Sequence, residues 1–256
     1  YRDEVPDVFE SHDKSFLIHL GWSSTTRAKD KSVEQDVINS KKLFEFYQKK
    51  NRNGHIIFLS TAGDLHRDTD NDIPTPHSLY GKCKLEVENI LNELDVQTTI
   101  FRVTNIWGGV VDKKRINGLV DKLLALLDTD EVVEIYANLR TTVDIIHVDD
   151  VIDLILKSIL GVFKTQHETF LVGSQSITIY DIIDRVSMRG TLNLKLNQKA
   201  EKSYLNIDTS KVKEILNWQP KHNLNSRLLL HFGELKSILS SFLSGMKGWK
   251  NFLYQT

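Results

Sequence analysis

A tyrosine and a lysine four residues apart are the first pair in this sequence whose types and spacing could do chemistry. Tyr80 and Lys84 lie in HSLYGKCKLEVENIL (77–91), whose apolar spacing predicts an amphipathic helix. Residues i and i+4 share a helix face, so the ammonium would lie one turn from the phenol. A free phenol has a pKa of about 10, and a neighbouring cation lowers it. Such a pair could exchange a proton with a sugar or alcohol hydroxyl near neutral pH.

Alone, this pattern is more often an ordinary solvated helix face, but neighbouring segments favour chemistry. The apolar run HIIFLS (55–60), which we interpret as a buried strand, is followed directly by Thr61. The next predicted strand, VQTTIFRVTNIWG (96–108), carries Asn105 towards its end. Ligands of parallel sheets bind beyond the carboxyl ends of the strands. We therefore expect a hydroxyl, a phenol, an ammonium and an amide to converge on one crevice.

The predicted elements alternate between strand and helix, and the strands are continuously apolar. This is typical of a parallel sheet covered on both faces. We expect the fold class to be α/β: a Rossmann-like, doubly wound parallel sheet with a small C-terminal α+β substrate-binding region. We assign 1–108 and 141–160 to the nucleotide-binding part, and 109–140 and 161–256 to the substrate-binding region. Helices are expected at 32–50, 79–94, 115–127 and 150–160, and a further strand at 168–173.

Composition excludes several classes of protein. The net charge of −1 gives no basic surplus for nucleic acid or an anionic membrane. The single cysteine, Cys83, excludes an internal disulfide and suits the cytoplasm. No apolar run approaches the about 18 residues that a membrane-spanning helix needs. The start of the chain is too polar for a signal peptide and lacks a methionine, so we expect a fragment or a trimmed chain.

Several segments, in order over roughly residues 15 to 220, carry a resemblance to a known family. They are FLIHLGWSS, IIFLSTAG, SLYGKCKLEVENIL, IFRVTNIWG, VDIIHVDDVIDLIL, ETFLVGSQSITIYDII and LNIDTSKVKEILNWQP. The set resembles the extended short-chain dehydrogenases/reductases, specifically the NAD-dependent epimerase/dehydratase family that acts on nucleotide sugars. Cys83 stands where the family's Tyr-Gly-x-Ser-Lys motif has serine.

The resemblance implies catalytic roles. Tyr80 would be the acid/base at a sugar hydroxyl, Thr61 would orient the same hydroxyl, and Lys84 would hold the nicotinamide ribose and tune the phenol. Hydride would pass between C4 of the sugar and NAD. The family's 4,6-dehydratases carry Thr-Asp-Glu at the strand end. This chain has Thr61-Ala62-Gly63, which disfavours dehydration and leaves a 4-epimerase, or alternatively a 4-ketoreductase.

The resemblance also implies binding residues and partners. Gly21 and Ser60 would contact NAD together with the tyrosine–lysine pair, and Asn105 would bind the phosphates or the sugar. Arg140 is a further candidate for the phosphates. A nucleotide sugar is the expected substrate, in surface-polysaccharide precursor synthesis. A homodimer through helices 33–50 and 79–94 is expected.

The sequence departs from the family at its front, where a Gly-x-x-Gly-x-x-Gly turn would hold the pyrophosphate. No segment here has that spacing and context, and the resemblance implies that the N-terminal strands of the sheet are missing. We therefore expect this chain to bind NAD poorly or not at all. Either the natural protein is longer, or the chain is a non-catalytic remnant that acts in binding or assembly. His147, Asp149 and Asp150 lack metal-ligand spacing, and we expect either aspartate to cap the following helix. The amphipathic segment 226–253 is expected to cap the core, or alternatively to lie on a membrane or a partner.

Overall fold

The chain divides into two compact units, Tyr1–Lys221 and His222–Thr256. The computed structural model describes residues 15–22, 32–69, 73–109, 118–161, 163, 165–197, 201–226 and 228. Every element and site below belongs to the first unit. The segment 226–253 lies largely outside the described residues.

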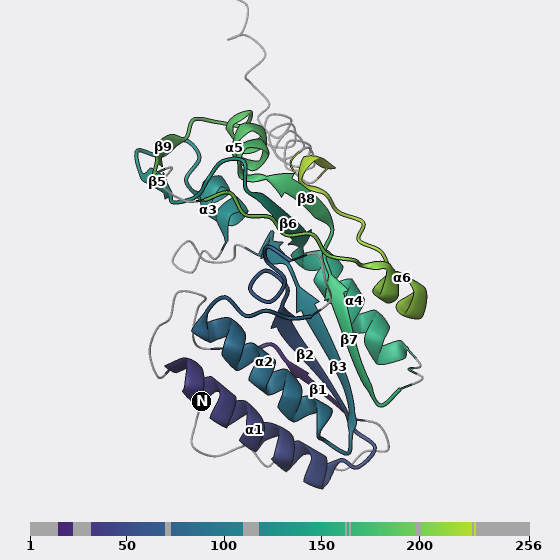
Figure 1. The fold of residues 1–256 in the computed structure, drawn as a ribbon. Helices are drawn as coiled ribbons and strands as arrows, with labels where there is room; N and C mark the ends of the chain where they lie inside the picture. Colours follow the sequence, from purple (N-terminus) through teal and green to yellow (C-terminus); the bar gives the residue numbers. More distant parts are fainter. Residues whose placement is uncertain are drawn as a thin grey trace, which may run out of the picture. The chain divides into compact units, whose positions relative to one another are not determined.

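A four-stranded parallel sheet forms the centre of the first unit (Figure 1). Its strand order is β1-β2-β3-β7, and each neighbouring pair is parallel. This confirms the Rossmann-like fold class. The strand β7 belongs to this sheet, although the sequence placed residues 161–256 in the substrate-binding region. The strands are β1 (Phe16–His19), β2 (His55–Thr61), β3 (Gln97–Val103) and β7 (His167–Val172).

Helices cover both faces of this sheet, as the continuously apolar strands predict. On one face, α1 (Ser32–Lys50) and α2 (Leu79–Asn92) share a buried core with Ile56 and Phe58 of β2 (Figure 1). Ile57, which points to the other face, packs in a second core. That core includes side chains of α4 (Val148–Leu160) and α6 (Ser210–Leu216). Alternate residues of one strand thus join two cores, because successive side chains of a strand point to opposite faces.

The predicted strand 96–108 is divided at Thr104. β3 stays in the large sheet, and β4 (Asn105–Trp107) joins a three-stranded sheet of order β4-β6-β8. Thr104 fixes the division, because its N–H donates to Val172 O (2.9 Å) and its hydroxyl to Asp144 Oδ1 (2.8 Å). The other elements are β5 (Val132–Ile135), β6 (Thr142–His147), β8 (Gln175–Thr178), β9 (Asn193–Leu196), α3 (Leu119–Ala125) and α5 (Ile179–Ser187).

Helix α4 begins earlier than the sequence predicts, and the expected aspartate cap is wrong. His147 is the N-cap residue, and its Nδ1 accepts the N–H of Asp149 at 3.2 Å. Asp150 is buried in the first turn, where its carboxylate accepts the N–H of Lys221 at 2.9 Å.

The described residues contain no group of three or more His, Cys, Asp or Glu side chains that could hold a metal ion. Over the same part of the chain, every helix is too short or too polar to cross a membrane.

Candidate functional site

The first turn of α2 is docked on a buried carboxylate that follows β2. Ser78 is the N-cap residue: its hydroxyl accepts the N–H of Gly81 at 3.2 Å and donates to Asp64 Oδ2 at 2.9 Å. A Cβ atom at Gly81 would overlap that same carboxylate, so glycine is needed for the close approach. The helix start that carries Tyr80 is therefore positioned by the loop after the strand.

Tyr80 and Lys84 share one face of α2, as their spacing predicts. The Lys84 side chain is buried, with 4% of the residue exposed. Its Nζ donates to Leu59 O at 2.9 Å, near the carboxyl end of β2. Three aromatic rings surround the ammonium, with their centroids 4.0 Å (Trp22), 4.6 Å (Phe58) and 5.7 Å (Tyr80) from Nζ.

The pKa of Tyr80 is raised, whereas the sequence-based expectation was that Lys84 lowers it. Burial raises the pKa of Tyr80 to about 12, and the negative charges of Asp64 and Asp36 add to the increase. Burial lowers the pKa of Lys84 to about 7, although Asp36 and Glu88 favour its charged form. The prediction that the ammonium lowers the phenol's pKa is wrong for this structure, because desolvation and the carboxylates dominate.

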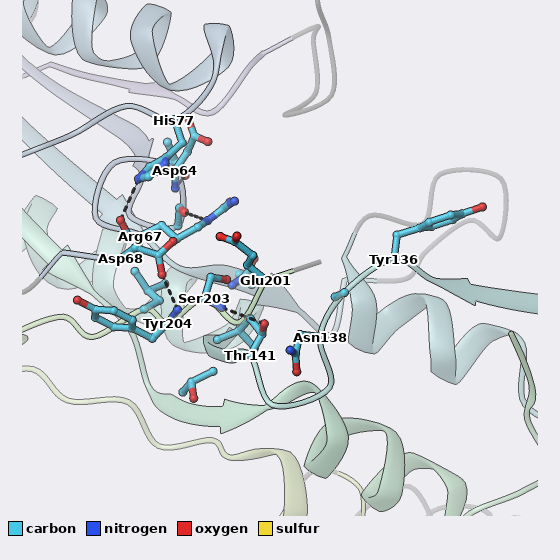
Figure 2. A pocket seen from close by; sticks show the side chains of 17 residues that line it. Asp64, Arg67, Asp68, His77, Tyr136, Asn138, Thr141, Glu201, Ser203 and Tyr204 are labelled. Atoms are coloured by element: carbon cyan, nitrogen blue, oxygen red, sulfur yellow. Dashed lines mark hydrogen bonds between the residues drawn. The ribbon is translucent and has the colours of Figure 1, made fainter. Parts of the chain in front are cut away.

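A cavity of about 490 Å³, lined mostly by polar side chains, includes residues of the loop that follows β2 (Figure 2). It brings together two of the predicted residues, Thr61 and Asn105. Tyr80 and Lys84 are not among the described residues that line the cavity. Asp64 connects the cavity with the helix that carries Tyr80 and Lys84, because it lines the cavity and accepts a hydrogen bond from Ser78 at the start of α2. The cavity's other polar lining includes Arg67, Asp68, His77, Tyr136, Asn138, Thr141, Glu201, Ser203 and Tyr204.

Hydrogen bonds order the two predicted cavity residues. The hydroxyl oxygen of Thr61 accepts the N–H of Asp64 at 3.4 Å. The Asn105 side-chain N–H group donates to Asp144 O at 2.8 Å, across the β4–β6 pair. Opposite them, Asp68 accepts the N–H of Tyr204 at 2.8 Å and thereby joins the β2 loop to the 201–205 segment (Figure 2).

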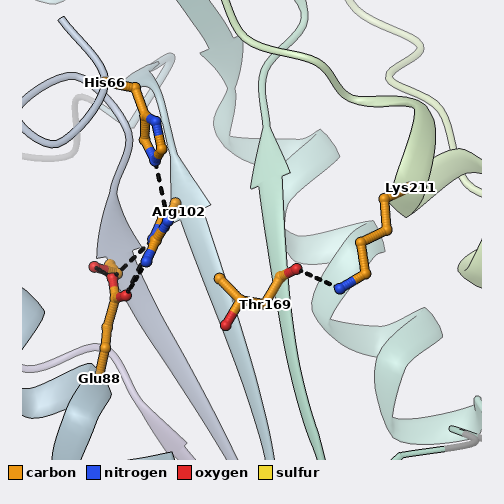
Figure 3. A network of polar contacts seen from close by, with 6 residues as sticks. His66, Glu88, Arg102, Thr169 and Lys211 are labelled. Atoms are coloured by element: carbon orange, nitrogen blue, oxygen red, sulfur yellow. Dashed lines mark hydrogen bonds and ion pairs between the residues drawn. The ribbon is translucent and has the colours of Figure 1, made fainter. Parts of the chain in front are cut away.

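Ser60, a predicted cofactor residue, is buried in a polar network. Its hydroxyl donates to Glu88 of α2. The Glu88 carboxylate also accepts hydrogen bonds from Arg102 of β3, which in turn donates to His66 Nε2 at 3.1 Å (Figure 3). The network joins the ends of β2 and β3 to α2, so the Ser60 hydroxyl already has a structural partner.

The last two predicted residues lie outside the cavity lining. Gly21 is exposed between β1 and Trp22. Arg140 is also exposed, and its backbone N–H donates to Asn138 Oδ1 at 2.9 Å. The guanidinium that does line the cavity belongs to Arg67, whose Nε donates to Gly63 O at 3.3 Å.

Sequence reasoning missed Asp64 and Arg67 as site residues. It placed Trp22 near the crevice, as a ring that stacks on a nucleotide base or packs in the core, but did not predict its contact with Lys84. A signal existed for Asp64, since Asp64-Leu65-His66 stands where the family has Val-Tyr-Gly after the strand-end hydroxyl. No periodicity identifies Trp22 as the ring above Lys84, because the contact joins residues 62 positions apart.

Comparison with known proteins assigns this chain to a family. A family model described as NAD dependent epimerase/dehydratase family matches residues 1–173. The chain belongs to that family. Its epimerase-like segments therefore have a common origin with NAD-dependent enzymes, which confirms the resemblance found in the sequence. No curated protein sequence matches this member of the family.

Several solved structures have the same fold as this chain, at low sequence identity. UDP-glucose 4-epimerase from Thermotoga maritima, solved with UDP-glucose, has a TM-score of 0.73 and 23% identity, over 88% of this chain and 78% of that one. UDP-glucuronic acid 4-epimerase from Bacillus cereus, solved with UDP-glucuronic acid and NAD, has a TM-score of 0.72 and 20% identity, over 88% and 76%. MoeE5, solved with UDP-glucuronic acid and NAD, has a TM-score of 0.71 and 17% identity, over 82% and 75%.

Proposed function

We propose that this protein is an NAD-dependent 4-epimerase of nucleotide sugars of the UDP-hexose type. The observation that carries the proposal is the Tyr80–Lys84 pair on α2, a helix whose N-cap is hydrogen-bonded to Asp64. Asp64 lines the same polar cavity as Thr61 and Asn105. Family membership supports the coenzyme, and the neighbours solved with UDP-sugars support the substrate class.

In this proposal Tyr80 takes the proton of the sugar's C4 hydroxyl, while the Thr61 hydroxyl holds the oxygen of the same group. NAD, when bound, supplies the hydride acceptor. The donor set suits a nicotinamide ribose, because the Lys84 ammonium lies at the carboxyl end of β2 on the same helix face as the phenol. Gly21 and the Ser60 backbone, which lie at the ends of β1 and β2, are proposed as further contacts of the coenzyme.

The cavity is proposed to take the sugar and the diphosphate. Asn105 offers an amide, and Arg67 offers a guanidinium that suits phosphate oxygens. Arg140 is a weaker candidate, since the cavity lining does not include it. Dehydration is disfavoured, because Ala62 and Gly63 carry no acid and the next carboxylate, Asp64, is buried against Ser78.

A second candidate function is non-catalytic binding of a nucleotide sugar by the same fold. The raised pKa of Tyr80 favours it, since burial and two carboxylates oppose formation of a phenolate, and so do the aromatic rings that lie against Lys84, where a ribose would have to bind. This candidate retains the cavity and its affinity for a nucleotide sugar but lacks turnover.

Conversion of UDP-glucose to UDP-galactose, followed by proton NMR, tests the proposal on the natural full-length protein. Tyr80→Phe is expected to abolish turnover while UDP-glucose still binds. Tyr180→Phe is the matched control, because Tyr180 is 57% exposed on α5. Binding without turnover by the unaltered protein, over a panel of UDP-hexoses, would favour the second candidate. Net consumption of NADH or NADPH with a 4-keto sugar would indicate a ketoreductase.

Homodimerisation through α1 and α2, and synthesis of surface-polysaccharide precursors in the cytoplasm, are further parts of the proposal. Sedimentation of the protein with a charge introduced on α1 at Ile38, which is 47% exposed, tests the dimer. A dimer that persists unchanged would place the interface elsewhere.

A further inference from the structure

Among the described residues, the Lys84 ammonium makes one hydrogen bond and lies against two aromatic rings. An ammonium has three N–H donors. One of them is used by Leu59 O at 2.9 Å. The ring centroids of Trp22 and Phe58 lie 4.0 Å and 4.6 Å from Nζ, in the range of cation–π contacts. Two aromatic rings thus lie against the ammonium that, in the proposed function, holds the ribose.

The two covering rings are held differently. Phe58 is a fully buried residue in the middle of β2, and it packs against Phe44 and His19. Trp22 follows the end of β1 and is only partly buried. Its contacts with Tyr80 and Phe58 are edge-on or tilted, with centroids 6.0 Å and 6.4 Å away. Displacing Trp22 would thus disturb the core less than displacing Phe58.

The polar end of the Trp22 indole is not satisfied in this position. Its Nε1 is buried and has no hydrogen-bond partner among the described residues. A buried N–H without an acceptor opposes burial of the ring, so the indole is retained by the ammonium and the neighbouring rings. An indole held in this way can be displaced by a ligand that supplies better acceptors to Lys84.

We propose that Trp22 is the residue that sets coenzyme affinity, by covering the Lys84 ammonium until the ribose hydroxyls of a nicotinamide coenzyme displace the indole. This inference rests on the proposed function, in which Lys84 holds that ribose. Two hydroxyl oxygens need two of the ammonium's N–H donors, and the indole, with its centroid 4.0 Å from Nζ, occupies space beside those donors. The contact between indole and ammonium is lost when the coenzyme binds, which weakens binding.

Calorimetric titration of the natural full-length protein with NAD⁺ tests the inference in three variants. Trp22→Ala is expected to bind NAD⁺ about tenfold more tightly than the unaltered protein, the equivalent of one cation–π contact. Trp22→Phe keeps a smaller ring and is expected to fall between them. The control Leu20→Ala shortens an exposed side chain of the same segment and is expected to change nothing. Circular dichroism verifies that each variant is folded.

A second readout needs no coenzyme. The pH dependence of Lys84 acylation, followed by mass spectrometry, reports whether water reaches Nζ. Trp22→Ala is expected to raise the pKa of Lys84 above about 7, because water replaces the indole, so that labelling begins at higher pH. At high pH, where the amine is neutral in both proteins, the more accessible Nζ of Trp22→Ala is expected to be labelled faster. Leu20→Ala is expected to match the unaltered protein.

The outcomes separate the inference from the proposed function. Equal or weaker NAD⁺ binding by Trp22→Ala would overturn the inference and leave the proposed function standing, since the indole would then be a bystander or a direct contact. Binding by none of the proteins at millimolar NAD⁺ would overturn the proposed function, and the inference with it. Unchanged Lys84 labelling in Trp22→Ala would show that the indole does not cover the ammonium.

Discussion

The carboxylate of Glu88 on α2 accepts hydrogen bonds from Nη2 of Arg102 on β3 at 2.6 Å and from its Nε, which lies 3.0 Å from Oε2 and 3.2 Å from Oε1 (Figure 3). Both side chains are largely buried, with 2% and 12% exposed. The same carboxylate accepts the hydroxyl of Ser60, next to Thr61. One ion pair therefore fixes the helix that carries Tyr80 and Lys84 against the strand ends that line the cavity.

Glu88→Gln is expected to destabilise the protein by about 3 to 5 kcal/mol, because it leaves the Arg102 guanidinium buried without its counter-charge. Urea unfolding at neutral pH measures the change. The control is Glu134→Gln, which breaks an exposed ion pair with Lys195 and should cost less than about 1 kcal/mol. Similar small losses in both variants would contradict a structural role for the buried pair.

Gly81→Ala is expected to destabilise the protein by about 1 to 3 kcal/mol, since the added Cβ would overlap the Asp64 carboxylate. The higher helix propensity of alanine, worth about 1 kcal/mol, opposes this loss only in part. Thermal unfolding compares it with Gly63→Ala, where the new Cβ would meet open space. If Gly81→Ala were as stable as the control, Asp64 would not be held against the helix start.

Periodicity and residue type predicted the elements of the large sheet well, because continuously apolar strands and one-sided helices follow directly from burial. The helix at 32–50 and the strand at 55–60 illustrate this. Local patterns did not reveal that Thr104 divides the strand 96–108, since its partners Val172 and Asp144 come from distant segments. The same reason hid the ring of Trp22 over Lys84 and the position of Arg67 in the cavity.

The prediction that the pKa of the Tyr80 phenol is lowered was wrong for another physical reason. The spacing of Tyr80 and Lys84 gives the sign of one charge interaction, whereas desolvation depends on everything packed around the ring. Asp64 and Asp36, which also raise that pKa, come from two different elements. A sequence pattern therefore identified the pair but not its electrostatic environment.

The protein is expected to lose stability as the pH falls from 6.5 to 4. Burial lowers the pKa of both His19 and His55 to about 4, whereas the unfolded chain binds these protons near the ordinary value of 6.5. The unfolded state then holds more protons throughout this window, so acid favours unfolding, by on the order of 3 kcal/mol per histidine. Urea midpoints at several pH values measure the slope. His55→Asn should make it shallower, and an unchanged slope would exclude His55 as a contributor.

Arg67→Gln is expected to weaken UDP-glucose binding by roughly tenfold, the loss of one charge-assisted contact to phosphate. Arg67 lines the cavity, whereas Arg140 does not. Arg140→Gln is therefore expected to bind UDP-glucose as the unaltered protein does. Calorimetry with both variants decides which arginine faces the phosphates, and a loss confined to Arg140→Gln would favour the arginine that the sequence suggested.

The central claim is that the Tyr80 phenol exchanges the proton of the sugar, and the pH profile of kcat/KM tests it most directly. Asp64→Asn removes a negative charge that raises the phenol's pKa, while the amide oxygen can still accept the Ser78 hydroxyl. Because kcat/KM reports ionisations of the free enzyme, the limb that rises with pH should move to lower pH in Asp64→Asn. A limb that stays in place in an active Asp64→Asn protein would contradict proton transfer by Tyr80.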